Sequence, residues 1–317
     1  MPRGADSAKR TERLLIVGGT GFIGTELAYI AKQQGYEVSL LSISGHPRQP
    51  EFGGVELLQA DIRALNVLRE ALGDRRYDYV VNCSGYINHS PVSEQGRSVI
   101  DTHFSGVMNL VECVSHNGLK GFVQIGSSDE YGMNPAPQRE NARESPISPY
   151  SLAKVAATQF IQLMHRMESF PGVVLRLFLV YGPGQGAERF LPQVIQGCME
   201  DKEFPVSAGE QLRDFCFVTD IVKGILATLK RPETRGKIIN LGSGNPARIR
   251  DVIQLVRDTI GKGKPKFGAL PYRAGENMEL YADIENARKY LGWAPLVTLE
   301  EGIELTVRSF SHRASVV

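Results

Sequence analysis

The chain of 317 residues is long enough to bury a full core, and its 42% hydrophobic and 22% charged content is ordinary for a globular protein. Because 36 basic side chains nearly balance 35 acidic ones, the net charge of +1 gives no reason to expect nucleic acid or a membrane as a partner. The four cysteines are scattered, and the sequence shows no signal peptide and no long apolar run, so we expect a cytoplasmic protein without a metal site, a disulfide framework or a membrane span.

The first apolar run, over residues 13–17, predicts a strand buried on both faces of a parallel sheet. It leads into Gly18-Gly-Thr-Gly-Phe-Ile-Gly24 and then into a predicted helix over residues 25–34. Glycine at this spacing allows a tight turn and a close approach of the backbone to a pyrophosphate, while amides at the helix start can bind phosphate. The stretch predicts a dinucleotide site built from Gly18, Gly21, Phe22, Ile23 and Gly24.

A second strand is predicted over residues 37–41, and Ser42 follows it. At this point an NAD-binding chain is expected to carry an acidic residue that binds the ribose hydroxyls, and none is present. A carboxylate would repel a 2′-phosphate, whereas Ser42 and Arg48 could bind one. The sequence therefore favours NADP over NAD as the cofactor.

Short apolar runs continue to alternate with helical stretches, which predicts a doubly wound parallel sheet of the Rossmann type, an α/β fold. The predicted strands cover residues 55–58, 79–82 and 121–125, and the helices between them cover residues 64–72 and 99–116. Asp61 and Ile62 follow the third strand and are expected near the adenine. Ser84 follows the fourth strand and is expected beside the pyrophosphate and the nicotinamide ribose.

A candidate catalytic group comes after the strand over residues 121–125, where Ser127 and Ser128 stand at its carboxyl end. Tyr150 and Lys154 are four residues apart in a predicted helix, so their side chains share one face. The ammonium of Lys154 should lower the pKa of Tyr150, which is normally about 10. Tyr150 could then exchange a proton with a substrate hydroxyl or carbonyl whose oxygen a serine holds.

After a predicted strand over residues 173–180, glycine and proline become frequent and the regular alternation ends. We therefore expect a dinucleotide-binding domain over residues 12–181 and a smaller substrate-binding lobe over residues 182–317, with residues 215–241 returning to the first domain. Arg213 and Arg273 both fall in this lobe. Two guanidinium groups that converge on a diphosphate would let a nearly neutral protein bind a nucleotide-linked substrate.

Together these motifs resemble the extended short-chain dehydrogenase/reductase family, in particular its nucleotide-sugar epimerases, dehydratases and ketoreductases. The resemblance covers about residues 14–307 and rests on several motifs: Gly18 to Gly24, Ser127 to Gly132, Tyr150 to Lys154, Tyr181 to Gly184, Arg213 to Phe215, Asn240 to Gly244, and Tyr281 to Trp293.

The resemblance implies a role for each matching residue. Tyr150 would be the acid/base, and Lys154 would bind the nicotinamide ribose and tune Tyr150. Ser128, or Ser127 if the register slips by one residue, would bind the reacting sugar oxygen. Arg213 and Arg273 would hold the diphosphate.

The chain also departs from the family pattern at two positions. Leu179 and His103 each stand where the family usually has asparagine. Leu179 puts a substrate contact near the diphosphate in doubt, and His103 puts the helix support near Lys154 in doubt.

Within the group, the segment from Ile125 to Gly132 looks most like NADP-dependent reductases of nucleotide-diphosphate 4-keto-6-deoxy sugars, which serve deoxysugar biosynthesis. In such an enzyme C4 receives a hydride and Tyr150 protonates the oxygen.

Three alternatives remain open. The first is a nucleotide-sugar 4-epimerase with tightly held NAD. The second is a 4,6-dehydratase that uses Asp129 and Glu130 as acid and base. The third is a non-catalytic regulator, against which the intact Tyr150, Lys154 and serine pair argue. The family resemblance further implies a homodimer that pairs the Tyr150 helix with the helix before it.

Overall fold

The computed structural model describes residues 10–44, 54–116, 118–272 and 275–314. Arg48 and Arg273, two of the predicted ligand-binding residues, lie outside these ranges. Within the described residues, no helix is both long enough and apolar enough to cross a bilayer.

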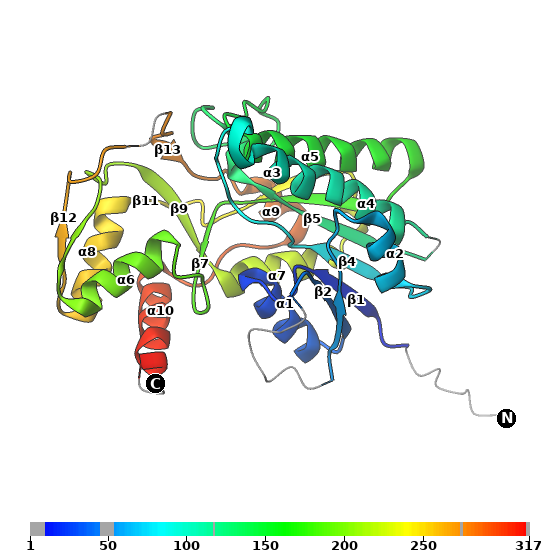
Figure 1. Cartoon of the computed structure of the whole chain (residues 1–317), viewed down its shortest axis with the longest axis horizontal. Coiled ribbons are helices and arrows are strands. Elements are labelled where there is room, and N and C mark those ends of the chain that lie inside the picture. Colours follow the sequence, from blue (N-terminus) through cyan, green and yellow to red (C-terminus); the bar gives the residue numbers. More distant parts are fainter. Residues whose placement is uncertain (1–9, 45–53, 117, 273–274, 315–317) are drawn as a thin grey trace.

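The centre of the described part of the chain is a seven-stranded sheet in the order β10-β6-β5-β4-β1-β2-β3 (Figure 1). Its strands are β1 (Arg13–Val17), β2 (Glu37–Ser42), β3 (Glu56–Gln59), β4 (Tyr79–Asn82), β5 (Gly121–Ser127), β6 (Gly172–Leu177) and β10 (Ile238–Leu241). Every neighbouring pair is parallel. The strand order reverses between β1 and β4, which is the switch point where doubly wound sheets bind ligands. The predicted Rossmann-type fold is confirmed.

Helices cover both faces of this sheet because successive strand residues point to opposite sides. Leu14 and Ile16 of β1 belong to one apolar cluster, and Leu15 and Val17 to the other. The first face is covered by α1 (Phe22–Gln33), α7 (Val218–Leu229) and α9 (Glu285–Leu291). The second is covered by α2 (Leu65–Leu72), α4 (Gly106–Val114) and α5 (Pro149–Glu168).

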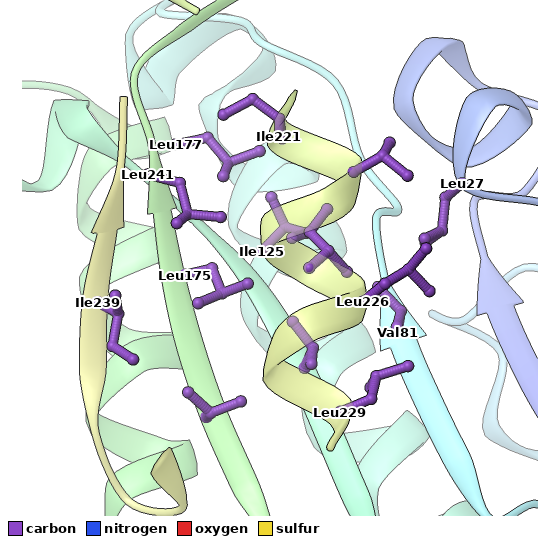
Figure 2. Packing of buried hydrophobic residues seen from close by; sticks show 14 of the residues in the cluster. Leu27, Val81, Ile125, Leu175, Leu177, Ile221, Leu226, Leu229, Ile239 and Leu241 are labelled. Atoms are coloured by element: carbon purple, nitrogen blue, oxygen red, sulfur yellow. The ribbon is translucent and has the colours of Figure 1, made fainter. Parts of the chain in front are cut away.

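Figure 2 shows how α7 packs on the first face of the sheet. Ile221 of this helix lies toward Leu177 from β6, while Leu226 lies toward Leu27 of α1 and Val81 of β4, all of them buried. Helix α7 thereby carries the chain back to the sheet after the second lobe.

The second lobe lies beyond one end of the large sheet (Figure 1) and has its own apolar cluster. A four-stranded sheet joins β7 (Leu179–Tyr181), β9 (Leu212–Phe217), β11 (Pro246–Arg248) and β13 (Glu279–Leu280), and β8 (Glu203–Pro205) pairs with β12 (Lys264–Lys266). Its helices are α6 (Phe190–Glu200), α8 (Ile249–Ile260) and α10 (Leu299–Ala314). Shorter elements elsewhere are α3 (Arg97–Ile100), the π-helical turns η1 (Val92–Gly96) and η2 (Asp101–Ser105), and the 3₁₀ turns η3 (Ser128–Tyr131) and η4 (Pro232–Thr234).

The observed elements differ from the predicted ones where the chain moves between the two sheets. The strand predicted over residues 173–180 is broken, because β6 ends at Leu177 and β7 pairs with β9 instead. The return predicted over residues 215–241 begins at Val218, since β9 still belongs to the lobe sheet. Trp293 packs in the core of the large sheet although it falls within residues 182–317. The division into two domains stays a prediction.

Candidate active site

The turn between β1 and α1 has the shape that a dinucleotide requires. Gly18 has a φ of +75°, and a Cβ added there would lie 2.8 Å from the Cα of Ser84. A Cβ at Gly24 would overlap the carbonyl oxygen of Gly18. Gly21 precedes α1 without a side-chain cap, so the amides of Phe22, Ile23 and Gly24 in the first turn are available to phosphate. These residues fit a dinucleotide, and Ser84 lies directly against the turn.

The end of β2 offers less to a 2′-phosphate than the sequence suggested. The Ser42 hydroxyl is buried and lies 2.6 Å from the Thr20 hydroxyl, so it braces the glycine turn. Arg48, the other group expected to bind this phosphate, lies outside the described residues.

Asp61 and Ile62 follow β3 at the carboxyl edge of the sheet, as expected. The Arg63 guanidinium binds the Asp61 carboxylate and lowers the pKa of that carboxyl. Ile62 is buried against Gly106, and its carbonyl accepts a hydrogen bond of 2.9 Å from Asn109.

Helix α5 begins with a capping box that places Tyr150 in its first turn. The Ser148 hydroxyl accepts from the Ser151 amide at 3.1 Å, and the Ser151 hydroxyl accepts from the Ser148 amide at 2.9 Å. Lys154 lies one turn further on, and its Nζ is 5.8 Å from the centroid of the Tyr150 ring. The structure thus brings the predicted pair together, and both side chains are buried.

Ser127, the last residue of β5, lies close enough to Tyr150 to act on it, and its hydroxyl partly offsets the rise of the tyrosine pKa. The Ser127 hydroxyl also accepts from the Asp129 amide at 3.2 Å, since Ser127 caps the turn η3. Ser128 is already inside that turn. Of the two serines in the sequence hypothesis, Ser127 is therefore the one that reaches the tyrosine.

The structure does not show the expected effect of Lys154 on the pKa of Tyr150. Burial raises the pKa of Tyr150, and the negative charge of Asp129 raises it further. The Lys154 ammonium donates to the Ile125 carbonyl at 2.9 Å, and burial lowers the pKa of Lys154 to about 8. Because the buried site penalises every charge, the expectation of a lowered tyrosine pKa is wrong.

The dehydratase alternative uses Glu130 as an acid or base, and the structure argues against this because the side chain has no exposed surface. One carboxylate oxygen accepts from the Ser127 amide at 2.9 Å. The other accepts from Arg176 at 2.9 Å and from the Thr158 hydroxyl at 2.7 Å. Glu130 therefore braces the serine turn and cannot touch a substrate.

Two histidines that sequence reasoning did not place in the site contact the Tyr150 ring edge-on. The ring centroid of His103 lies 5.0 Å from that of Tyr150, and the centroid of His89 lies 5.6 Å away. His103 was noticed only as a departure from the family pattern, and nothing in the sequence marked His89. Nε2 of His89 lies 2.8 Å from the Asp129 carboxylate, which keeps Asp129 beside the tyrosine.

Of the substrate-binding residues predicted in the lobe region, the structure describes Arg213 and Leu179. Arg213 on β9 pairs with the Glu276 carboxylate and donates to the Leu212 carbonyl at 2.8 Å. Leu179 on β7 pairs with β9 in the same sheet. Arg189, which the sequence did not single out, precedes α6, and its positive charge lowers the pKa of Tyr150. The lobe thus adds a cation within electrostatic range of the tyrosine.

Known proteins resemble the chain over nearly its whole length. A UDP-glucuronate 4-epimerase of Thermodesulfobacterium geofontis is 28% identical over 310 residues, which cover 92% of this chain and 94% of the relative. An epimerase of Methanothermobacter thermautotrophicus superposes with a TM-score of 0.88 at 26% identity, over 96% of this chain and 94% of that chain. The UDP-glucuronic acid 4-epimerase of Bacillus cereus, solved with UDP-glucuronic acid and NAD, superposes with a TM-score of 0.85 at 26% identity, over 95% of this chain and 99% of that chain.

A family model covers the glycine turn, the serine turn and the Tyr150 helix in one continuous match. Residues 14–242 match the model described as the NAD dependent epimerase/dehydratase family. The resemblance drawn from the motifs is therefore confirmed, and this chain belongs to the NAD dependent epimerase/dehydratase family.

Proposed function

We propose that the protein is an NAD-dependent 4-epimerase of a nucleotide-diphosphate sugar. The observation that carries the proposal is the buried pair of Tyr150 and Lys154, whose Nζ lies 5.8 Å from the tyrosine ring centroid, at the carboxyl edge of the sheet where the glycine turn can hold a dinucleotide. The sequence favoured a reductase of 4-keto-6-deoxy sugars, but the relatives named above are epimerases and support the alternative. The dehydratase reading required Asp129 and Glu130 as a pair, and Glu130 is sealed from the site.

In the proposed mechanism Tyr150 transfers the proton and Ser127 holds the sugar oxygen. When bound, NAD supplies the oxidation and the re-reduction of the sugar carbon C4. The Tyr150 oxygen accepts the proton of the C4 hydroxyl and later returns a proton to the same sugar oxygen. Ser127 donates a hydrogen bond to that oxygen and so stabilises the negative charge that develops on it.

We propose NAD rather than NADP as the cofactor. Ser42 is engaged with Thr20, which leaves its hydroxyl less available to a 2′-phosphate. The structure of the Bacillus cereus epimerase, which this chain resembles over 95% of its length, contains NAD. Gly18, Gly21 and Gly24 would hold the pyrophosphate, and Lys154 would bind the nicotinamide ribose.

The test uses purified protein with UDP-glucose, UDP-galactose and UDP-glucuronate, without any added reductant. We expect a 4-epimer from at least one sugar, detected by proton NMR. Tyr150→Phe should lower the rate at least about 100-fold, because the acid/base is lost. Tyr29→Phe is the matched control, since Tyr29 is exposed on α1 and its loss should change nothing. Oxidation of NADPH by a nucleotide 4-keto-6-deoxy sugar, with no epimer from any hexose, would instead identify a reductase.

We also propose that a homodimer forms through α5. The residues suggested by the sequence split between two faces, since Phe160 and Met164 pack against the core while Leu163 is exposed. Leu152, Leu163 and Met167 together form an exposed apolar stripe along the helix. A monomer in sedimentation velocity at micromolar concentration would contradict this part of the proposal.

A further inference from the structure

His89 and Asp129 form a polar pair beside Tyr150 that the proton transfer described above does not use. Nε2 of His89 lies 2.8 Å from Oδ2 of Asp129, and the two side chains are 42% and 29% exposed. His89 comes from the loop after β4 and Asp129 from the turn after β5, two neighbouring strands of the sheet. The pair is therefore accessible to a ligand and lies next to the buried tyrosine.

The proposed reaction determines which part of the sugar lies near this pair. In the proposed reaction C4 of the sugar lies at the Tyr150 hydroxyl, so polar groups near the Tyr150 ring can act on the substituents of the carbons next to C4. The ring of His89 packs edge-on against the Tyr150 ring, and the negative charge of Asp129 acts on both Tyr150 and Lys154. Asp129 therefore lies within electrostatic range of the carbon next to C4.

The hydrogen-bonding capacity of Asp129 is only partly used. His89 occupies Oδ2, while Oδ1 makes no hydrogen bond with any of the residues that the structure describes. An ionised carboxylate accepts hydrogen bonds and donates none. It can bind a sugar hydroxyl, whereas a second carboxylate at the same place would meet a like charge.

We propose that the His89–Asp129 pair determines substrate specificity by selecting a sugar whose C5 carries a neutral hydroxymethyl group and by disfavouring a uronic acid, which carries a carboxylate there. The substrate class is then a neutral nucleotide-diphosphate hexose. This inference rests on the proposed function, because it takes the Tyr150 hydroxyl as the position of C4. His89 holds the Asp129 carboxylate through Nε2 at 2.8 Å and orients it, so it acts through Asp129 as a positioning residue.

The experiment measures binding and turnover on the NAD-loaded protein with two probes, UDP-glucose and UDP-glucuronate. Calorimetry gives the two dissociation constants, and product analysis gives kcat/KM for each sugar. We expect the wild type to prefer UDP-glucose by about tenfold or more in both measurements, the size that charge repulsion at a partly exposed site allows. Asp129→Asn should reduce this preference by about tenfold, and His89→Leu, which has no hydrogen-bond donor, should increase it by leaving the carboxylate without its partner.

The ratio between the two sugars is the informative quantity, because a change in Tyr150 that slows both reactions cancels in it. Asp74→Asn, an exposed position in the loop before β4 at the opposite edge of the sheet, is the matched control and should leave the ratio unchanged.

Three outcomes distinguish failure of the specificity inference from failure of the proposed function. Equal or tighter binding of UDP-glucuronate by the wild type, as expected if Arg189 dominates the local charge, overturns the inference. An unchanged ratio in Asp129→Asn also overturns it. Selective binding of UDP-glucose without any epimer formation preserves the selectivity and overturns only the proposed function.

Discussion

At the scale of single residues, the Tyr150 ring is held by a histidine that burial keeps neutral. His103 is 3% exposed and lies 2.8 Å from the Tyr86 carbonyl through Nε2, so that nitrogen carries the proton. Gly85 has a φ of +118°, and a Cβ there would overlap the His103 ring. The imidazole therefore fixes the tyrosine and the loop after β4 together.

His103 should make the protein sensitive to mild acid. Burial lowers its pKa from an ordinary 6.5 to about 3. Between these values the unfolded chain binds a proton that the native imidazole does not, so stability is complete above pH 6.5 and is lost as pH falls. At pH 5 the loss is about 2 kcal/mol from this group. Urea unfolding at pH 7 and pH 5 should show a smaller difference for His103→Asn, and an equal difference would contradict the assignment.

At the scale of elements, two glycines with similar backbone angles have different roles at the two ends of α1. Gly18 precedes the helix with a φ of +75° and packs on Ser84. Gly35 follows the helix with a φ of +85°, and an added Cβ there would meet nothing within 4 Å. Both positions need glycine for their conformation, but only Gly18 also needs it for close packing.

The pair Gly18→Ala and Gly35→Ala separates conformational strain from loss of the dinucleotide turn. Gly35→Ala should cost about 1 kcal/mol of stability and leave NAD affinity unchanged. Gly18→Ala carries the same strain and also displaces Ser84, so we expect a larger loss of stability and NAD binding weaker by at least tenfold. Thermal unfolding and calorimetry with NAD give both quantities, and parallel behaviour of the two variants would argue against a binding role for Gly18.

A buried ion pair connects β6 to the turn η3 next to Ser127. Arg176 and Glu130 are both without exposed surface, and Arg176 also binds Glu144 at 2.6 Å. The guanidinium lies 4.5 Å from the centroid of the Tyr131 ring. Since Glu130 binds the Ser127 amide, this pair supports the position of the serine hydroxyl.

Arg176→Met should be strongly destabilising because it leaves a buried carboxylate without its partner, and we expect a loss of about 3–5 kcal/mol. The double variant Arg176→Met/Glu130→Gln removes that charge and should recover part of the loss. Denaturant titration of the wild type and these variants checks both statements. A double variant less stable than Arg176→Met alone would contradict the account.

At the scale of the whole molecule, the Asp214 carboxylate ties the lobe to the sheet. Asp214 lies on β9 in the lobe and is 1% exposed. Its oxygens accept from the amides of Ser243 and Gly244, which follow β10 of the large sheet, and from Ala282 at 3.0 Å. Three chain segments distant in sequence therefore meet at one carboxylate.

Asp214→Asn should loosen this junction, because the amide nitrogen of asparagine would face backbone donors. We expect a loss of about 2–3 kcal/mol of stability. We also expect a higher KM for the nucleotide sugar, since the lobe faces the site through Arg189. Asp258→Asn, an exposed substitution on α8, is the control for both measurements. Unchanged KM together with lowered stability would show that the junction is structural only.

Features set by local spacing were determined by the sequence alone. Glycine at every third residue between a strand and a helix specified the dinucleotide turn, and Tyr150 four residues before Lys154 specified a shared helix face. The alternation of apolar runs with helices specified the parallel sheet, because each feature depends only on neighbours along the chain.

The tertiary structure decided what depends on partners distant in sequence. From the sequence Glu130 could serve as an acid or base, but in the folded chain Arg176, 46 residues further along, binds its carboxylate. The choice between Ser127 and Ser128 needed the path of β5, and the roles of His89 and His103 needed the packing of their rings on Tyr150. Charge, burial and contact are properties of the folded chain, and no local pattern encodes them. For the same reason the motif shared by reductases and epimerases could not by itself distinguish the two reactions.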